Sequence, residues 1–330
     1  MTLSLAVEAT PARFASFHVP GWVWATLIGA IVVLLVADLL IVHRKPHAIT
    51  MREAGIESAV WIGIGLAFTV VMLVWQGGDA AGEYLAGYLI EKSLSIDNVF
   101  VWAVILGYFA VPPEFQFRVL FWGIFGALVL RAGFIFAGVT LIERFDWILY
   151  VFGAFLIFTA VRIARHSDRQ VHPEDNPVLK LFRRVVPSTT EYDGQKMFTR
   201  RSGRLLATPL FAVLVLIEST DVVFAVDSIP AILAVSREPF IVFSSNAFAI
   251  LGLRALYFVL AGMAGRFRYL NLGLGVILGF VGVKMIIAEW YHLPTWVSLL
   301  VIAAVLTVTI VASLRAERRD AMAGAAQDGD

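Results

Sequence analysis

The chain has 330 residues, of which 59% are hydrophobic and only 15% are charged, and its mean hydropathy is +0.82. Soluble domains carry about 25% charged residues, so this composition predicts an all-α polytopic membrane protein. The net charge of +1, with no basic stripe that interleaves aromatic residues, excludes a nucleic-acid-binding role. The absence of cysteine excludes disulfides, thiolate metal ligands and a cysteine nucleophile.

Nine segments are long and apolar enough to cross a bilayer, which takes about 20 residues. In chain order they cover residues 22–42, 57–76, 86–108, 117–139, 147–164, 205–235, 241–262, 270–289 and 295–314. We expect one membrane domain over residues 1–330, with a short disordered tail after Arg315. The sixth segment is long enough to contain a break.

The distribution of basic residues predicts that the N-terminus is outside and the C-terminus inside. With that orientation the outside segments hold only Arg13, Arg144 and Arg237, and all other basic residues between the spans fall inside. The long loop 165–204 is then cytoplasmic. Its Asp193-Gly194 pair is a turn signal that predicts a small β-hairpin, with an irregular basic loop as the alternative.

Two parts of the chain resemble each other. "SIDNVFVWAVI", which begins at Ser95, aligns with "STDVVFAVDSI", which begins at Ser219. Three pairs match at offsets of 124, 123 and 122 residues: Asp97 with Asp221, Arg131 with Arg254, and Arg162 with Lys284. Because each repeat has three helices, helices 3–5 (86–164) and 6–8 (205–289) are expected to be inverted repeats, as in many secondary transporters, with helices 1, 2 and 9 outside them.

Five carboxylates lie inside the third and sixth predicted spans: Glu91, Asp97, Glu218, Asp221 and Asp227. Without partners, five ionised groups at helix centres would cost on the order of 15 kcal/mol. The inverted repeat would place the two paired aspartates near mid-bilayer and Glu91 and Asp227 roughly 9 Å further out. Such groups face a cavity, a bound cation or a protein cation, and Lys92, Arg131 and Arg254 are available. The alternative is a set of salt bridges that only lock the bundle.

Helical spacing adds a condition for a shared site. Glu218 and Asp221 share a helix face, whereas Asp227 lies on the opposite side of a regular helix. Pro230 removes one helical hydrogen bond, so we expect a break there that would bring Asp227 to the same site. In the third span, Glu91, Ser95 and Asn98 share a face, with Asp97 to one side.

The side chains offered by these spans are hard oxygen donors, including the Asn98 amide and the hydroxyls of Ser95, Ser219 and Thr220. Oxygen donors suit Mg²⁺, Ca²⁺ and Mn²⁺ rather than Zn²⁺ or Cu⁺. Because carboxylates also bind protons, metal/proton exchange is the mechanism that this set allows, with no permanently bound cofactor. Asp38 in the first span can pair with Arg44, reach the interface or serve transport.

These stretches resemble the TerC family of integral membrane proteins, including its Alx-type members. The resemblance covers most of the chain and is carried by "EKSLSIDNVFVW", "LLATPLFAVLVLIESTDVVFAVDSIPAIL" and "PFIVFSSNAFAILGLRALYFVLAG". It implies manganese export, metal supply to secreted enzymes, an association with tellurium resistance, and a bacterial inner membrane, with thylakoid relatives as an alternative. The metal-site residues that it implies are Glu91, Asp97, Asn98, Glu218, Asp221 and Asp227.

Two function classes compete on the sequence. The first is an exporter of Mn²⁺, with Ca²⁺ and Mg²⁺ open on the residues alone, which uses protons as coupling ions. The second is a non-transporting scaffold or sensor in a tellurite or metal stress complex, for which loop 165–204 is the candidate surface. An intramembrane enzyme is not expected, because HExxH, a GxSG serine motif and a histidine within a span are all absent. Asn246 faces either the transport path or another helix.

Overall fold

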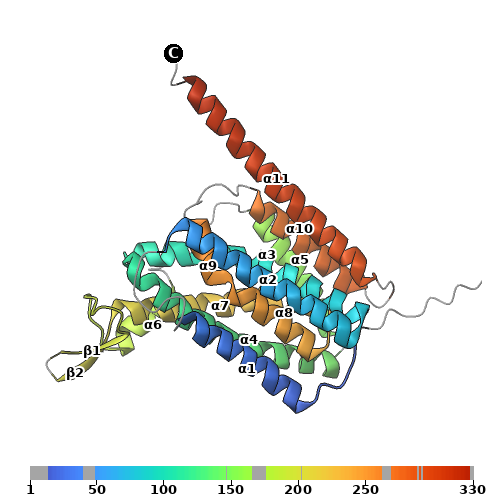
Figure 1. The fold of residues 1–330 in the computed structure, drawn as a ribbon, viewed down its shortest axis with the longest axis horizontal. Coiled ribbons are helices and arrows are strands. Elements are labelled where there is room, and N and C mark those ends of the chain that lie inside the picture. Colours follow the sequence, from blue (N-terminus) through green and yellow to red (C-terminus); the bar gives the residue numbers. More distant parts are fainter. Residues whose placement is uncertain are drawn as a thin grey trace, which may run out of the picture.

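The computed structural model describes residues 14–39, 49–145, 147–165, 176–201, 203–261, 269–287, 290 and 293–327. Within these ranges the side chains of Asp97 and of residues 163–165, 261, 270–271 and 317–327 are not described. The described residues form a bundle of long helices and one small β-hairpin that lies at an end of the bundle (Figure 1).

The elements follow one another in a simple order. The helices before the hairpin are α1 (Gly21–Ala37), α2 (Met51–Gln76), α3 (Gly78–Tyr108), α4 (Pro113–Arg144), α5 (Ile148–Arg165) and α6 (Pro177–Val185). The hairpin consists of β1 (Phe198–Arg201) and β2 (Arg204–Ala207). The helices after it are α7 (Pro209–Leu233), α8 (Pro239–Leu251), α9 (Leu253–Ala261), α10 (Leu270–Ile287) and α11 (Thr295–Gln327).

Every predicted span overlaps a helix of the structure. Five helices of the described chain are long and apolar enough to cross a membrane: α2, α4, α7, α8 continued into α9, and α11 as far as Ala316. Shorter apolar helices occupy the α1, α5 and α10 positions. Helix α3 has 31 residues and carries buried acidic side chains. A polytopic all-helical membrane protein is therefore confirmed.

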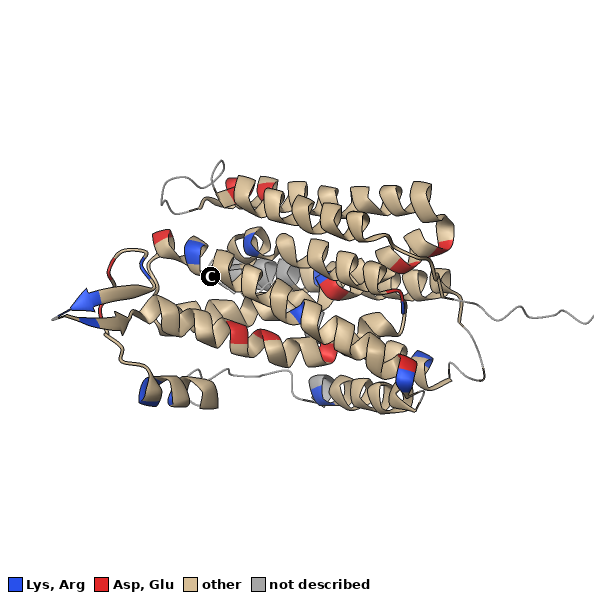
Figure 2. Cartoon of the chain, turned by 90° about the horizontal axis from the view of Figure 1, so that it is seen from below, with Lys and Arg blue, Asp and Glu red and all other residues tan. Residues whose placement is uncertain are grey.

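The centre of the bundle is built from helices of both halves of the chain. Helix α3 packs against α7 and α8, α4 packs against α7, and α5 packs along α10. Helices α1, α2 and α11 lie on the outside and expose apolar residues such as Val32, Val74 and Val308. Charged positions are found along the helices as well as at their ends (Figure 2). Helices α3, α4, α7 and α8 therefore pack together, and charged side chains on their facing sides lie inside the bundle.

Local sequence explains where the helices start. Thr50 and Glu53 form a reciprocal capping box at the beginning of α2, with the Thr50 amide donating to Glu53 Oε2 at 2.9 Å. Proline occupies the first turn of α4, α7 and α8, where its missing N–H is not needed. Gly77 alone separates α2 from α3 and has a φ of 88°, a backbone angle that favours glycine.

The hairpin lies further along the chain than predicted. Gly203, with a φ of 77°, lies directly before β2, and β2 takes residues that had been assigned to the start of the sixth span. The span therefore begins at Pro209. Asp193 and Gly194 form a turn that precedes the hairpin, and the Thr199 hydroxyl, 2.7 Å away, and Lys196, 3.0 Å away, lower the pKa of Asp193.

Two further expectations are wrong. Helix α7 runs without a break from Pro209 to Leu233: Pro230 removes one helical hydrogen bond, but residues 228–233 are all buried and stay helical. The tail after Arg315 is helical rather than disordered, since α11 continues to Gln327 and projects beyond the other helices (Figure 1). The unbroken α7 keeps Glu218 and Asp227 on different sides of the helix.

The close contact of α5 with α10 gives a prediction on stability. A Cβ added at Gly282 would lie 2.8 Å from the Gly153 carbonyl oxygen, whereas at Gly63 of α2 it would meet nothing within 4 Å. We expect Gly282→Ala to lower the free energy of unfolding by about 1–3 kcal/mol through overpacking against backbone. Gly63→Ala, the matched control, should raise it by about 0.5–1 kcal/mol. Equilibrium unfolding in mixed micelles measures both, and equal values would contradict the packing argument.

Candidate functional site

Arg131 of α4 lies at the centre of the bundle, with 1% of its side chain exposed. Its Nε and Nη2 donate to the two carboxylate oxygens of Asp221 on α7, at 3.3 and 3.0 Å. Its Nη1 donates to Glu91 of α3 and, at 3.1 Å, to the Ser228 hydroxyl of α7. One guanidinium therefore joins three helices through a bidentate pair and a second ion pair.

Glu91 is fully buried, and its carboxylate accepts hydrogen bonds from neighbours on two helices besides Arg131. The Ser95 hydroxyl, one turn along α3, donates to Oε1 at 2.9 Å, and the Asn246 amide of α8 donates to Oε2 at 3.0 Å. Asn246 thus faces the acidic site rather than an unrelated helix contact. Glu91 and Asp221 carry two negative charges against the one positive charge of Arg131, so this cluster keeps a net charge of −1 when both carboxylates are ionised.

Glu218 lies one turn before Asp221 on α7, as the spacing predicts. Its carboxylate packs against Gly126 of α4, where an added Cβ would overlap it. Its Oε2 is buried and has no hydrogen-bond partner among the described residues. Among the described residues no cationic side chain pairs with Glu218. A bound cation or a proton could therefore neutralise this carboxylate without displacing a protein side chain.

The structure places the other predicted site residues differently. Asp227 accepts a hydrogen bond at 3.1 Å from the Thr159 hydroxyl of α5, on the far side of the unbroken α7. Asn98 is buried on α3. The backbone of Asp97 lies in α3, but its side chain is outside the described part of the structure. The structure therefore brings Glu91, Asp221 and the neighbouring Glu218 together and leaves Asp227 apart.

Two supporting residues point elsewhere. The Lys92 ammonium donates to the Ala249 carbonyl of α8 at 3.2 Å rather than to an acidic side chain. The Ser219 hydroxyl donates to the Leu216 carbonyl at 2.8 Å and accepts from Asn176, the residue that caps α6, at 3.4 Å. Ser219 thus connects α7 to the segment before the hairpin.

Arg254 of α9, the predicted repeat mate of Arg131, is also buried between two carboxylates. It forms ion pairs with Asp38 at the end of α1 and with Glu57 of α2, and its guanidinium lies 4.1 Å from the centre of the Phe117 ring. Arg131 and Arg254 therefore each bridge two acidic side chains. Arg254 does so with the outer helices, which attaches α1 and α2 to the central bundle.

Sequence reasoning missed several partners in these clusters. Ser228 lies within the second acidic motif, so its proximity to Arg131 could have been suspected from the motif alone. Glu57 carries no such signal, because it precedes an apolar run at the start of α2 like many interfacial residues. Arg44, the expected partner of Asp38, lies outside the described residues.

Two further charged side chains, one on α3 and one on α10, are buried away from Arg131. Glu83 of α3 has 1% exposure and accepts a hydrogen bond from the Ala15 amide at 2.7 Å. Lys284 of α10 is buried and donates to the Ser298 hydroxyl of α11 at 3.0 Å. Its predicted repeat mate, Arg162 of α5, is exposed instead.

The geometry limits what the site can hold as it stands. Among the described residues, no three acidic or histidine side chains are close enough together to coordinate a metal ion. Arg131 occupies the oxygens of Glu91 and Asp221 that a hard cation would use. A cation can therefore bind to this pair of carboxylates only when the guanidinium leaves at least one of them.

The chain matches the family described as "Integral membrane protein TerC family" over residues 76–321, about three quarters of its length. The chain belongs to the TerC family of integral membrane proteins. The matched residues include α3 to α10 and so contain Glu91, Arg131 and Asp221. The resemblance seen in the acidic motifs is therefore confirmed.

Individual TerC relatives resemble the chain over nearly their whole length. "Uncharacterized membrane protein STKORF319" of Myxococcus xanthus is 48% identical over 91% of this chain and 94% of its own. "Putative membrane-bound redox modulator Alx" of Escherichia coli K12 is 48% identical over 87% of this chain and 92% of its own. A membrane protein of Rickettsia bellii is 38% identical over 88% of this chain and 96% of its own. No solved structure matches this TerC protein.

Proposed function

We propose that this protein is a secondary transporter that exports a hard divalent cation, Mn²⁺, across the bacterial cytoplasmic membrane through its intramembrane carboxylates. The observation that carries the proposal is the convergence of Glu91 and Asp221, from two helices, on Arg131. Glu218, whose buried Oε2 has no hydrogen-bond partner among the described residues, lies one turn from Asp221. Buried acidic residues inside spans mark ion pathways and proton relays. Their oxygens, in a chain without cysteine, suit Mn²⁺, Ca²⁺ or Mg²⁺.

In the proposed mechanism Arg131 is the resident counter-ion of an empty site. A divalent cation that approaches Glu91 and Asp221 replaces the guanidinium at one or both carboxylates, and Arg131 returns when the cation leaves. This exchange gives the buried carboxylates a positive partner in both states: the guanidinium, which leaves a net charge of −1, in the empty state and the divalent cation in the loaded state. Glu218 takes up a proton when no cation is bound, which couples cation export to proton entry.

The proposal includes the topology on which export depends. We propose nine spans with the N-terminus outside and the C-terminus inside, and inverted repeats that consist of α3–α5 and of α7–α10. The contacts of α3 with α8 and of α4 with α7 are the pair expected from exchanging the two repeats, and α5 with α10 maps onto itself. Alternating access would then move one repeat against the other around the carboxylates.

The names of the relatives raise a second kind of activity. "Redox modulator" is the printed description of the Escherichia coli protein. This chain has no cysteine, so it cannot itself carry a thiol–disulfide step. Control of Mn²⁺ supply would act on redox processes indirectly, through the enzymes that receive the metal.

Flux measurements in proteoliposomes test the proposal. We expect liposomes that contain the wild-type protein to transport Mn²⁺ faster than protein-free liposomes, which serve as the blank. A trapped pH dye should report protons moving in the direction opposite to Mn²⁺. Glu218→Gln should reduce flux on the order of tenfold, which is the low end for groups that support a metal site, and should remove its dependence on a pH gradient. Ca²⁺ and Mg²⁺ in the same assay set the selectivity.

One negative result would contradict the proposal that the protein is a transporter. If no divalent cation moves faster than in empty liposomes, with or without a pH gradient, the carboxylates are structural. The scaffold or sensor function would then take its place, with α6 and the hairpin as the projecting surface (Figure 1). A scaffold should keep its partners when Glu218 is neutralised, whereas a transporter should lose flux.

A further inference from the structure

A groove on the outer side of the bundle lies between α10 and α11, away from the carboxylate site. Two adjoining cavities of about 440 and 510 Å³ form it, and both are lined by Tyr269, Val308 and Ala312. The residues lie on the lipid-facing side of α11, which exposes 67% of Val308. The groove is therefore separate from the proposed transport path and open to the surrounding bilayer.

The smaller cavity is almost wholly apolar. Leu272 and Val276, one turn apart on α10, face Ala304 and Val308 of α11 across it. Its floor is a close contact between the two helices, where a Cβ added at Gly273 would overlap the Thr309 side chain. A hydrocarbon chain fits such a channel, because it is about as apolar as the lipid tails around it.

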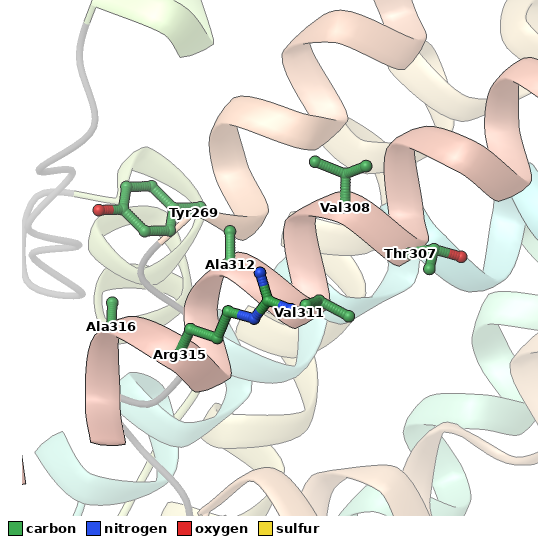
Figure 3. Close-up of a pocket in the computed structure, with 7 residues that line it drawn as sticks. All are labelled: Tyr269, Thr307, Val308, Val311, Ala312, Arg315 and Ala316. Atoms are coloured by element: carbon green, nitrogen blue, oxygen red, sulfur yellow. The ribbon is translucent and has the colours of Figure 1, made fainter. Parts of the chain in front are cut away.

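The other end of the groove is more polar and carries a positive charge. Arg315 and Tyr269 line the second cavity, and Arg315 runs back along α11 toward Val311 and Ala312 (Figure 3). The apolar run of α11 ends at Leu314, and Arg315 is the first charged residue after it, so Arg315 lies where lipid head groups are found. Among the described residues, none of the ion pairs uses Arg315.

We propose that this groove is a binding site for an anionic phospholipid. Its acyl chain lies along Leu272, Val276 and Val308, and its phosphate pairs with Arg315 beside the Tyr269 ring. Basic pockets between membrane helices that continue into an apolar channel have the charge and shape that such lipids need.

Native mass spectrometry of the full chain in detergent, titrated with phosphatidylglycerol or phosphatidylcholine, tests the site. We expect phosphatidylglycerol to bind at least about fivefold more tightly, the factor that corresponds to about 1 kcal/mol for one basic residue near a charged head group. Arg315→Gln should remove this preference. Ala312→Trp should fill the groove and weaken binding of both lipids, and glycerol phosphate without acyl chains should not compete.

Arg162→Gln is the matched control, because Arg162 is an exposed arginine near the end of α5, outside the groove. It should leave the lipid preference unchanged. Equal binding of the two lipids to the wild type, or a preference that survives Arg315→Gln, would overturn the proposal. Loss of binding in Arg162→Gln would also overturn it, since the preference would then come from general surface charge. Gel filtration and circular dichroism establish that each variant is folded, and Ala312→Trp provides a second test that leaves Arg315 in place.

Discussion

Replacing Arg131 with glutamine is expected to destabilise the protein by about 3–5 kcal/mol, the cost of removing one partner from a buried ion pair. The change leaves Glu91 and Asp221 facing each other with no positive charge between them. Neither carboxylate can reach water, because both are buried among α3, α4, α7 and α8. Unfolding by SDS in mixed micelles measures the free energy.

The control for Arg131→Gln is Arg162→Gln, which removes an exposed arginine and should change the free energy of unfolding by less than about 0.5 kcal/mol. Adding Glu91→Gln and Asp221→Asn to Arg131→Gln should recover much of the lost stability, because the uncompensated charges disappear with the guanidinium. Similar losses in Arg131→Gln and Arg162→Gln, or no recovery in the triple variant, would show that Arg131 does not neutralise the two carboxylates.

Asp221→Asn is expected to reduce Mn²⁺ flux at least about 10–100-fold, the range found when even indirect partners of a metal are removed. Asparagine keeps the size of aspartate and can still accept a hydrogen bond from Arg131, so we expect the fold to survive. It cannot carry the negative charge that attracts the cation. Proteoliposome flux, compared at equal amounts of folded protein, is the measurement.

Asp193→Asn makes the same chemical change outside the helix bundle, before the hairpin, and should leave Mn²⁺ flux within about twofold of wild type, as expected for a surface position. Wild-type flux in a folded Asp221→Asn protein would remove Asp221 from the transport path. A loss of flux in both variants would instead point to a general effect of surface charge on the assay.

The ion pairs around Arg131 show why part of the site could not be predicted from the sequence. Glu91, Glu218 and Asp221 were identified as intramembrane acids because a carboxylate in an apolar span is costly wherever the span lies. Their partners come from segments far apart in the sequence. Arg131 is 40 residues from Glu91 and 90 from Asp221, and it reaches both only because of how α3, α4 and α7 are rotated against one another.

Two errors have local causes that spacing does not encode. The hairpin turn was expected at the Asp193-Gly194 pair, but the strands that pair are the ones on either side of Gly203. The break expected at Pro230 is absent, because proline removes only one helical hydrogen bond and the buried residues around it stay helical. In each case the residue type was recognised correctly, and the surrounding structure decided its effect.

The sequence by itself determined the membrane class, the position of each apolar helix and the identity of the acidic residues within them. These properties depend on local composition, because hydrophobic length and the cost of a charge are set residue by residue. Only the tertiary structure decided that Arg131 binds Glu91 and Asp221, that Arg254 binds Asp38 and Glu57, and that Asp227 faces α5 instead. The choice of partner depends on helix rotation and packing between distant segments, which no periodicity in the chain records.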